Sequence, residues 1–408
     1  MRRLATTLSL LLVLAAVPAV GGLPEPAASG PSAQAPSPGA PLTQPHLLPA
    51  GPDAATGYPA PGVDLSNALD AQYGELSTRF RTHAARTAAA AVSGTARLDR
   101  YAAALAEIAA ATRRLEARSR AVRGGLANGS ISPPRAVARI GAITRAASVH
   151  RAALTDLEPV LQNETAGANP ARVERLENRT EALEDRLRSL VGPVTTRLAR
   201  GVTGYGFPGH VFVAATRGGV VLSVVDNGTY YREAIRPDNA DDATTTRDLR
   251  AGRDLVATLY PTTWSASATG VRRIALAGDD DFRVLLDYPG GRLSARIDAT
   301  TERVVREVHV INLSTYEPPA AKSKSKAGLV LTVNRTFAGG PLRVSLATAD
   351  GEPVDGRVAI EGTEVGSTGE DGVFWTVSAG GRGDGRVIVS AASGGTRIPL
   401  TFSLTDAG

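Results

Sequence analysis

The 408-residue chain contains no cysteine. Disulfide bonds, zinc sites with cysteine ligands, cysteine nucleophiles and a lipid-modified cysteine anchor are therefore excluded. Lysine is almost absent as well, because the only lysines among the 45 basic residues are Lys322, Lys324 and Lys326. We attribute this arginine bias to a GC-rich genome, so it carries little information about chemistry.

Motifs of enzyme active sites are also missing. The chain has no Gly-x-Ser-x-Gly, no phosphate-binding glycine loop, no dinucleotide fingerprint placed between a strand and a helix, and no His-Glu-x-x-His. No two histidines stand at metal-ligand spacing; the five are His46, His83, His150, His210 and His309. We therefore assign no catalytic, cofactor-binding or metal-binding residue and expect no cofactor. The net charge of +5 is modest for this length, so we expect no nucleic-acid partner.

Residues 1–22 have the layout of an export signal. Two arginines precede an apolar run over residues 8–17, and the small residues Ala19 and Gly21 follow it. An uncleaved anchor is the alternative, although the apolar run is short for a membrane span. No later segment approaches 18 apolar residues, so we expect a secreted or cell-surface protein.

Two further segments are predicted to be connectors. Residues 23–62 are dense in Pro, Ala, Gly and Ser and cannot bury a core, which predicts a disordered tether. Residues 317–327 contain two adjacent prolines and the three alternating lysines, which predicts a charged linker. The folded parts are then expected over residues 63–200, 201–316 and 328–408.

Residues 63–200 carry the apolar spacing of packed helices. Steps of three and four residues place one apolar stripe on each of three consecutive helices. The stripes are Leu98, Tyr101, Leu105, Ile108, Leu115 and Val122; Val137, Ile140, Ala147, Leu154 and Leu161; and Val173, Leu176, Leu183, Leu187, Leu190 and Leu198. Short breaks make neighbouring helices antiparallel, so we predict a coiled-coil-like antiparallel bundle. The first helix is predicted to end at Gly124-Gly125, followed by Asn128-Gly129 and Pro133-Pro134.

A single stripe on each helix would bury only a narrow core. The segment over residues 63–80 has the apolar spacing of one more helix, with Leu65, Leu69, Leu76 and Phe80. We expect these side chains to pack against the bundle. Helix-mediated homo-oligomerisation is the alternative way to complete such a core.

The remaining chain is rich in β-branched runs separated by turn residues. In residues 201–316 such runs surround one helical segment, 244–259, for which Asp242 is a candidate N-cap, and Asn227-Gly228 predicts a hairpin. This indicates an α+β domain with one helix on an antiparallel sheet. Residues 328–408 predict a small β-sandwich. The expected fold class is α, then α+β, then all-β.

Three stretches of the first two parts are distinctive. They are residues 127–132 (ANGSIS), Gly192-Pro193-Val194 and residues 220–239 (VVLSVVDNGTYYREAIRPDN). Together they resemble secreted haloarchaeal proteins that pair a helical domain of unknown function with a second such domain. The resemblance spans roughly residues 65–316 and implies an extracellular location without an assigned activity. The chain departs from that group in being basic, because halophile surfaces are normally acidic.

Two other resemblances concern the β-rich parts. Residues 351–360 (GEPVDGRVAI) and 366–375 (GSTGEDGVFW) resemble transthyretin-like and immunoglobulin-like modules of cell surfaces. In such modules the pattern serves strand pairing and packing, which implies no chemistry there. Residues 295–305 (ARIDATTERVV) more faintly resemble part of a peptidase-associated secreted domain.

Asn-x-Ser/Thr sequons indicate a glycoprotein if the chain is exported. The candidate sites are Asn128, Asn163, Asn178, Asn312 and Asn334. They are expected at turns or exposed helix faces. Asn227 also stands in a sequon, but the hairpin already explains it.

Arginines gather where the first two predicted helices meet. They are Arg113, Arg114, Arg118, Arg120 and Arg123, followed by Arg135, Arg139 and Arg145. Antiparallel packing brings both groups to one end of the bundle, with Glu116 as the only acid expected nearby. This predicts a surface for an anionic cell-envelope component, such as an acidic glycan, a protein layer or a lipid head group. The alternative is an ordinary solvated helix surface.

These observations favour a secreted, cell-envelope-associated, non-catalytic interaction or scaffold protein. The alternative is a secreted enzyme or peptidase-associated regulator with its site in residues 201–316. Carboxylate-based hydrolases leave little trace in the linear sequence, so the absence of motifs does not decide between the two.

Overall fold

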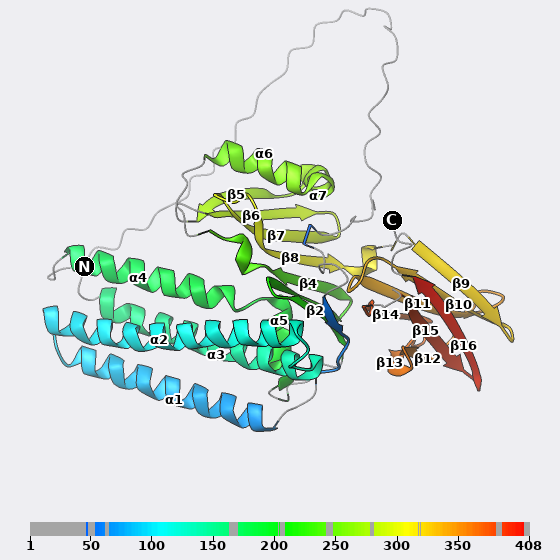
Figure 1. Cartoon of the computed structure of the whole chain (residues 1–408), viewed down its shortest axis with the longest axis horizontal. Coiled ribbons are helices and arrows are strands. Elements are labelled where there is room, and N and C mark those ends of the chain that lie inside the picture. Colours follow the sequence, from blue (N-terminus) through cyan, green and yellow to red (C-terminus); the bar gives the residue numbers. More distant parts are fainter. Residues whose placement is uncertain are drawn as a thin grey trace, which may run out of the picture. The chain divides into compact units, whose positions relative to one another are not determined.

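A computed structural model gives the fold of the chain (Figure 1). It describes residues 46–47, 54–61, 65–162, 170–202, 204, 209–241, 248–277, 281–316, 318, 320–380 and 386–403. Over these residues the chain forms seven α-helices and sixteen β-strands. The predicted export signal, most of the predicted tether and the sequon at Asn163 lie outside the described residues. None of the described helices is long and apolar enough to cross a membrane.

The first part of the chain is helical, as predicted. Its helices are α1 (Leu65–Ala90), α2 (Gly94–Ala127), α3 (Pro133–Gln162), α4 (Pro170–Ser189) and α5 (Pro193–Val202). Helix α3 packs against the other four, and α1 to α4 run alongside one another (Figure 1). The apolar stripes predicted for α2 to α4 are buried or half-buried in one core. The predicted third helix is two helices, because the chain breaks after Ser189 and restarts at Pro193.

Helix α2 continues past Gly124-Gly125, the first of the breaks predicted to end it, and reaches the second, Asn128-Gly129. It stops at the C-cap Asn128, whose N–H donates to the carbonyl of Gly124 at 3.0 Å. Gly129 then takes a φ of +75°, a conformation that favours glycine. Gly125 lies inside the helix because Ile131 folds back over it, where a Cβ would overlap the isoleucine side chain.

Helix α1 joins the bundle with the opposite face from the one predicted. It packs on α2 and α3 through a small and polar face that includes Thr82 and Ala89, both buried. Leu69, Leu76 and Phe80, which we expected in the core, are exposed. The side chain of Leu65 lies outside the described residues. The apolar spacing therefore correctly predicted a helix and wrongly predicted its buried face.

An eight-stranded antiparallel sheet follows the bundle. Its spatial order is β1-β2-β3-β4-β8-β7-β6-β5. The strands are β1 (Ala55–Gly57), β2 (Val211–Thr216), β3 (Gly219–Asp226), β4 (Thr229–Ile235), β5 (Arg272–Ala277), β6 (Asp281–Tyr288), β7 (Gly291–Asp298) and β8 (Val304–Asn312). The predicted hairpin joins β3 and β4, where Asn227 and Gly228 have φ values of +47° and +68°. Positive φ at both central residues is what a type I′ turn requires.

Both faces of this sheet are covered. Residues of β2 and β3 such as Val213 and Leu222 belong to the same apolar core as the bundle. Their neighbours Phe212 and Val221 belong to a second core, which also contains Val256 of α6. Successive side chains of a strand point to opposite faces, so β2 and β3 are buried on both sides.

Two helices cover the second face, where the sequence predicted one. They are α6 (Leu249–Leu259) and α7 (Pro261–Ala266). Helix α6 starts later than predicted because Asp248 caps it: its carboxylate accepts the N–H of Ala251 at 2.7 Å. The expected cap, Asp242, lies outside the described residues.

The end of the predicted tether is part of the fold. Strand β1 pairs with β2 along the edge of the sheet, and Leu47 is buried in the second core. Tyr58 stacks on His210 at 4.8 Å between ring centroids. A low content of large apolar residues hid these contacts, because each depends on a partner far along the chain.

The C-terminal part is a β-sandwich of two four-stranded sheets, as predicted. One sheet has the order β14-β11-β10-β9 and the other β13-β12-β15-β16. Their strands are β9 (Ala320–Lys326), β10 (Leu329–Arg335), β11 (Pro341–Thr348), β12 (Arg357–Ile360), β13 (Thr363–Ser367), β14 (Val373–Val377), β15 (Arg386–Ser393) and β16 (Thr396–Ser403). The inward side chains form a third core. The fold class is thus α, then α+β, then all-β.

Strand β9 corrects the predicted linker. Residues 320–326 pair along the full length of β10. The alternating lysines are exposed, and the ammonium groups of Lys322 and Lys326 donate to carbonyls of Thr401 and Arg397 in β16. Lysines on an edge strand discourage pairing with another chain, so this charged run is typical of a sandwich edge.

Candidate functional site

The arginines predicted as a partner-binding surface fall into two groups. Six are exposed and form no ion pair or side-chain hydrogen bond within the described part of the chain: Arg113, Arg114, Arg118, Arg120, Arg135 and Arg139. We call them the basic surface. They lie on the halves of α2 and α3 that adjoin the turn between these helices. The basic surface therefore consists of positive groups that the bundle itself does not neutralise.

The other two predicted arginines have partners inside the fold. Arg145 pairs with Glu75 of α1. Arg123 donates a hydrogen bond to the hydroxyl of Ser119 at 2.9 Å. Burial lowers the pKa of Arg123, and the negative charge of Asp238 partly offsets this by favouring the charged guanidinium. Glu116, expected to be the only nearby acid, accepts a bidentate pair from Arg186 of α4 at 2.8 and 2.5 Å. The acids in this region are therefore already engaged.

His150 of α3 lies close to positive charges beside the basic surface. Its pKa lies below the ordinary histidine value, first because the ring is buried. Arg114 and Arg81 lower the pKa further, since each disfavours a second positive charge. A helix from each side thus contributes positive potential at this point of the bundle.

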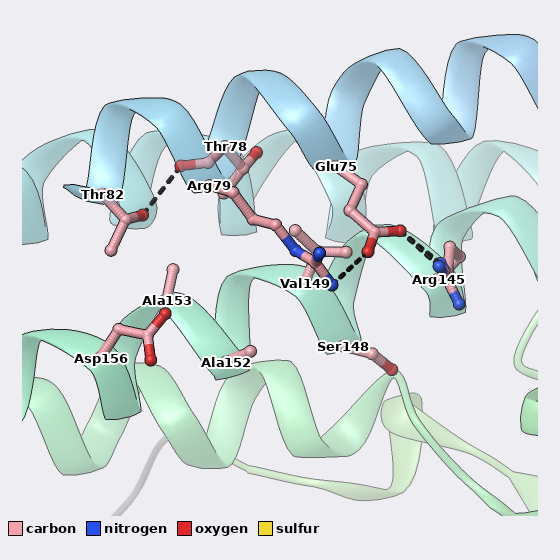
Figure 2. Close-up of a pocket in the computed structure, with 10 residues that line it drawn as sticks. All are labelled: Glu75, Thr78, Arg79, Thr82, Arg145, Ser148, Val149, Ala152, Ala153 and Asp156. Atoms are coloured by element: carbon pink, nitrogen blue, oxygen red, sulfur yellow. Dashed lines mark hydrogen bonds and ion pairs between the residues drawn. The ribbon is translucent and has the colours of Figure 1, made fainter. Parts of the chain in front are cut away.

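A groove of about 480 Å³ lies between α1 and α3 (Figure 2). Its lining residues are Glu75, Thr78, Arg79, Thr82, Arg145, Ser148, Val149, Ala152, Ala153 and Asp156. Glu75 bridges the two arginines, Arg79 and Arg145. Glu75 was not predicted as a site residue, because the apolar spacing of α1 favoured the opposite face of the helix as the buried one. The groove brings two arginines, two carboxylates and three hydroxyl-bearing side chains together, groups that bind polar ligands.

The outer face of α1 carries an unusual apolar stripe. Leu69, Tyr73, Leu76 and Phe80 have exposed fractions of 65, 77, 66 and 75%. They follow one another at steps of four, three and four residues, the spacing of one face of a helix. Contiguous exposed apolar patches mark interaction sites in soluble proteins. We call these four residues the α1 stripe.

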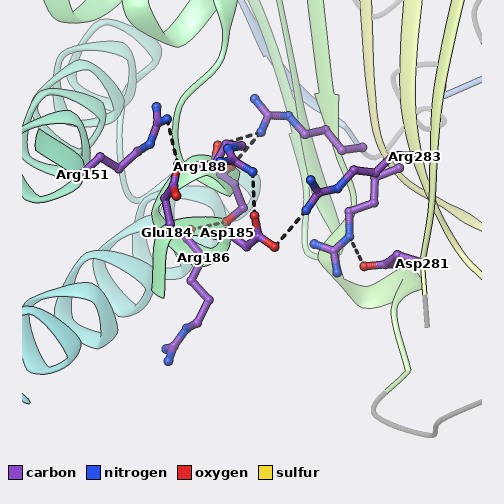
Figure 3. A network of polar contacts seen from close by, with 10 residues as sticks. Arg151, Glu184, Asp185, Arg186, Arg188, Asp281 and Arg283 are labelled. Atoms are coloured by element: carbon purple, nitrogen blue, oxygen red, sulfur yellow. Dashed lines mark hydrogen bonds and ion pairs between the residues drawn. The ribbon is translucent and has the colours of Figure 1, made fainter. Parts of the chain in front are cut away.

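Ion pairs hold the bundle to the sheet (Figure 3). Glu184 of α4 pairs with Arg188 at 2.5 Å and with Arg151 of α3 at 3.5 Å. Asp185 pairs with Arg188 at 2.7 Å and with Arg283 of β6 at 2.9 Å. Every arginine in this network has a carboxylate partner, unlike those of the basic surface.

A more buried pair joins the two parts at the turn between α4 and α5. Arg306 of β8 pairs with Glu233 of β4 at 2.6 Å and donates to the carbonyl of Val191 at 2.7 Å. Glu233 also accepts the N–H of Thr195 at 3.5 Å. Arg306 therefore binds a carbonyl just beyond the C-terminus of α4, and Glu233 binds an N–H at the N-terminus of α5. Helix dipoles favour a cation at the first position and an anion at the second. Gly192 is required here because a Cβ would overlap both side chains.

Glu307 forms the equivalent pair on the other face of the sheet. It pairs with Arg232 at 2.7 Å, and both side chains are fully buried. Glu233 and Glu307 are thus separated by the sheet, and each is neutralised by an arginine. Glu233 and Glu307 therefore do not form a carboxylate pair with each other. No group of three or more metal-ligating side chains occurs among the described residues.

The described sequons differ in their surroundings. Asn128 is exposed at the C-cap of α2, Asn178 is exposed on α4, and Asn312 is exposed as the last residue of β8. Asn312 accepts hydrogen bonds from Ser314, which engages its side-chain oxygen. Asn334 lies half-buried within β10, paired with strands on both sides. It does not occupy the turn or exposed position that we expected.

Comparison with family models divides the chain into three. Residues 1–205 match a domain of unknown function, DUF7096, and residues 211–317 match a family of unknown function, DUF7094. Residues 320–396 match the archaeal fibronectin-III type-like domain, a match that begins with β9. The chain therefore consists of two domains of unknown function followed by a fibronectin-III-like domain.

The first of these matches covers half of the chain, 205 of 408 residues. The protein belongs to the DUF7096 family. No curated protein and no solved structure matches the chain. The expected pairing of a helical domain of unknown function with a β-rich one is confirmed in this coarser form. The haloarchaeal relationship and secretion stay predictions.

Proposed function

We propose that this chain is a secreted, cell-envelope-associated, non-catalytic interaction protein. Its basic surface contacts an anionic component of the envelope. The export signal predicted over residues 1–22 directs the chain out of the cell, and the sheet and sandwich domains are displayed beyond the bundle. The observation that carries this proposal is the set of six exposed arginines that have no acidic partner among the residues that the structure describes.

The pairing of other arginines supports a functional reason for this set. Where an arginine joins two elements of the fold, a carboxylate pairs with it, as Glu116 does with Arg186 and Asp185 does with Arg283. The basic surface lacks such carboxylates, and mutual repulsion there costs stability that salt only partly screens. Guanidinium groups bind carboxylate, sulfate and phosphate groups through two parallel hydrogen bonds. An anionic partner would therefore supply the negative groups with which the arginines of the basic surface can pair.

The test removes charge from the basic surface without touching the ion pairs of the bundle. Arg114, Arg118, Arg135 and Arg139 are replaced by Gln, and Arg145 is kept because it pairs with Glu75. Four exposed ion pairs of about 0.4 kcal/mol each amount to roughly a tenfold loss of affinity. Retention of the protein on isolated cell envelopes, measured over a range of salt concentrations, reports this loss.

The matched control replaces four exposed arginines elsewhere that also lack an ion pair. They are Arg175, Arg179, Arg303 and Arg357. The control protein carries the same net charge as the test protein, so a general charge effect would weaken both equally. Equal retention of the two proteins would show that the basic surface is an ordinary solvated helix surface. Helix content by circular dichroism should be unchanged in both.

The α1 stripe favours a second role, self-association through α1. The stripe has the spacing of a coiled-coil seam, so two copies of α1 would pack as antiparallel helices. In that arrangement Tyr73 faces Leu76 of the second copy, and Leu69 faces Phe80. Asp70 then lies near Arg81 of the second copy, twice by symmetry, and both residues are exposed.

A further inference from the structure

The backbone of Leu47 is held by charged side chains of the sheet. The N–H of Leu47 donates to Oε2 of Glu307 at 3.3 Å, and its carbonyl accepts from Nη2 of Arg232. The partners are 260 and 185 residues further along the chain. The backbone N–H and carbonyl of Leu47 are therefore both hydrogen-bonded to one buried ion pair, Arg232–Glu307.

The surroundings of Leu47 have the character of a side-chain pocket. Leu47 is 5% exposed and belongs to the apolar core that includes Val256 and Leu293. The ring of His46 meets the ring of Tyr260 edge-on, with 5.8 Å between their centroids. Main-chain hydrogen bonds together with a pocket for one side chain are the means by which proteins recognise extended peptides.

The charged pair is complete without the segment that it binds. Nη1 of Arg232 donates to Oε1 of Glu307 at 2.7 Å, and the hydroxyl of Tyr260 donates to Oε2 at 3.0 Å. Nε2 of His309 lies 3.2 Å from Oε1. Burial raises the pKa of Tyr260 well above its ordinary value, as does the charge of Glu307, so the hydroxyl keeps its proton as a donor. Removing residues 46–47 would leave these partners in place.

The sheet is also complete without the segment. Residues 46–47 belong to none of the described strands, and all eight strands of the sheet pair without them. A segment that only stabilised the fold would ordinarily pair along a strand, as β1 does with β2. Here the hydrogen bonds come from side chains, which can release one peptide and accept another without disturbing a ladder.

We infer that Arg232, Glu307 and Tyr260 form an exchangeable peptide-binding site that His46-Leu47 occupies in the resting chain. Its ligand is an extended peptide segment with a leucine-sized side chain, a free N–H at that residue and an imidazole or aromatic ring just before it. The segment that occupies the site leads to β1, so the site anchors the chain that leads to the N-terminus. This inference does not depend on the basic surface or on an anionic partner.

The test uses the full chain with the site vacated. In the Leu47→Asp variant, burial in the apolar pocket and repulsion by Glu307 both disfavour the new carboxylate, so the attached segment leaves the site. A fluorescent peptide of residues 43–51 (TQPHLLPAG) should bind this variant at least about tenfold more tightly than it binds the parent. In the parent the attached segment occupies the site at an effective concentration on the order of millimolar. Fluorescence anisotropy measures both affinities.

Two altered peptides test recognition of the residue itself. Methylation of the nitrogen of Leu47 removes the N–H donated to Glu307, and replacement of Leu47 by Asp removes the side chain that fills the pocket. Each change should weaken binding to the Leu47→Asp protein roughly tenfold, the effect expected of one hydrogen bond to a charged group. The altered peptides leave the protein unchanged, so a folding defect cannot imitate the result.

Three outcomes would overturn the inference. The unmodified peptide binds neither protein, it binds both equally, or the methylated peptide binds as tightly as the unmodified one. Circular dichroism and thermal melting of the Leu47→Asp protein complete the test. A variant that no longer folds would show that residues 46–47 are a fixed part of the core.

Discussion

Arg232 and Glu233 are neighbours in β4 and form ion pairs on opposite faces of the sheet. Arg232 pairs with Glu307 at 2.7 Å on the face covered by α6 and α7, and Glu233 pairs with Arg306 at 2.6 Å on the bundle face. The same Arg-Glu dipeptide recurs at residues 306–307 of β8. The adjacent strands β4 and β8 are thus joined by one ion pair on each face of the sheet. One pair holds the helical bundle and the other holds the segment at Leu47.

Replacing Glu233 by Ala should destabilise the joint between the bundle and the sheet. The change leaves Arg306, whose side chain is 18% exposed, without its carboxylate partner, and it removes the acceptor for the N–H of Thr195. Breaking a buried ion pair by deleting one partner costs about 3–5 kcal/mol. Chemical denaturation measures the loss of unfolding free energy. Glu352→Ala, at an exposed turn, is the control and should change stability by less than about 0.5 kcal/mol.

Acid should weaken the fold through Glu307. Burial alone would raise the pKa of Glu307, but the nearby His309, Arg232 and Tyr260 outweigh burial and lower it to about 2. A carboxyl whose pKa is depressed by folding contributes its full stability above its unfolded pKa, near 4.5. That contribution is lost as the pH falls from about 4.5 towards 2. Unfolding free energy measured across this range should fall less steeply in the Glu307→Gln variant than in the parent.

Other carboxyls titrate in the same range, so Asp298 provides the comparison. Burial raises its pKa, but the N–H groups of Thr301, Asp241 and Thr300 outweigh that effect and lower the pKa below the ordinary value. An Asp298→Asn variant should flatten the pH dependence by a separate, additive amount. Parallel curves for the parent and the Glu307→Gln variant would contradict the assignment of this acid sensitivity to Glu307.

The sandwich should fold alone only when β9 is included. A fragment of residues 318–408 keeps the pairing of β9 with β10, whereas a fragment of residues 328–408 leaves β10 as an unpaired edge. An exposed edge strand promotes association between chains. The longer fragment should unfold cooperatively and remain monomeric, as followed by thermal melting and sedimentation. Equal cooperativity and solubility of the shorter fragment would show that β9 is dispensable.

The sequence predicted the elements whose signals are local. The hairpin expected at Asn227-Gly228 joins β3 to β4, because an Asn-Gly turn between β-branched runs is a local signal. Strand β9 could not be recognised, because its three lysines have the composition of a linker and only its pairing with β10 makes it a strand. The buried face of α1 was wrong for a related reason: spacing locates a stripe but does not show what covers it.

The candidate site divides in the same way. Repetition of arginine along α2 and α3 located the basic surface, whereas the partners of Arg123 and Arg145 come from elements far along the chain. The clamp on Leu47 was missed altogether. One signal was present, since an Arg-Glu dipeptide inside a strand buried on both faces must place one charge on each face. The partner of each charge follows only from the pairing of β4 with β8.

The last prediction concerns the α1 stripe. Four side chains bury much less than the roughly 800 Å² per partner of a typical stable interface, so we expect a weak dimer with a dissociation constant in the micromolar range or above. Replacing Leu76 and Phe80 by Gln should abolish the concentration-dependent dimer in sedimentation equilibrium. The matched control, Arg175→Gln with Arg179→Gln on α4, should dimerise like the parent. Loss of dimer in both proteins would point to a different interface.

A charge exchange tests the antiparallel arrangement itself. Asp70→Arg places two arginines, the new one and Arg81 of the second copy, side by side and should weaken the dimer severalfold, since each exposed pair is worth up to about 1 kcal/mol. Adding Arg81→Asp restores opposite charges across the interface and should restore the affinity of the parent. A parallel dimer would not be rescued, because Asp70 and Arg81 would then lie far apart. A parent chain that stays monomeric at millimolar concentration would show that the α1 stripe serves another partner.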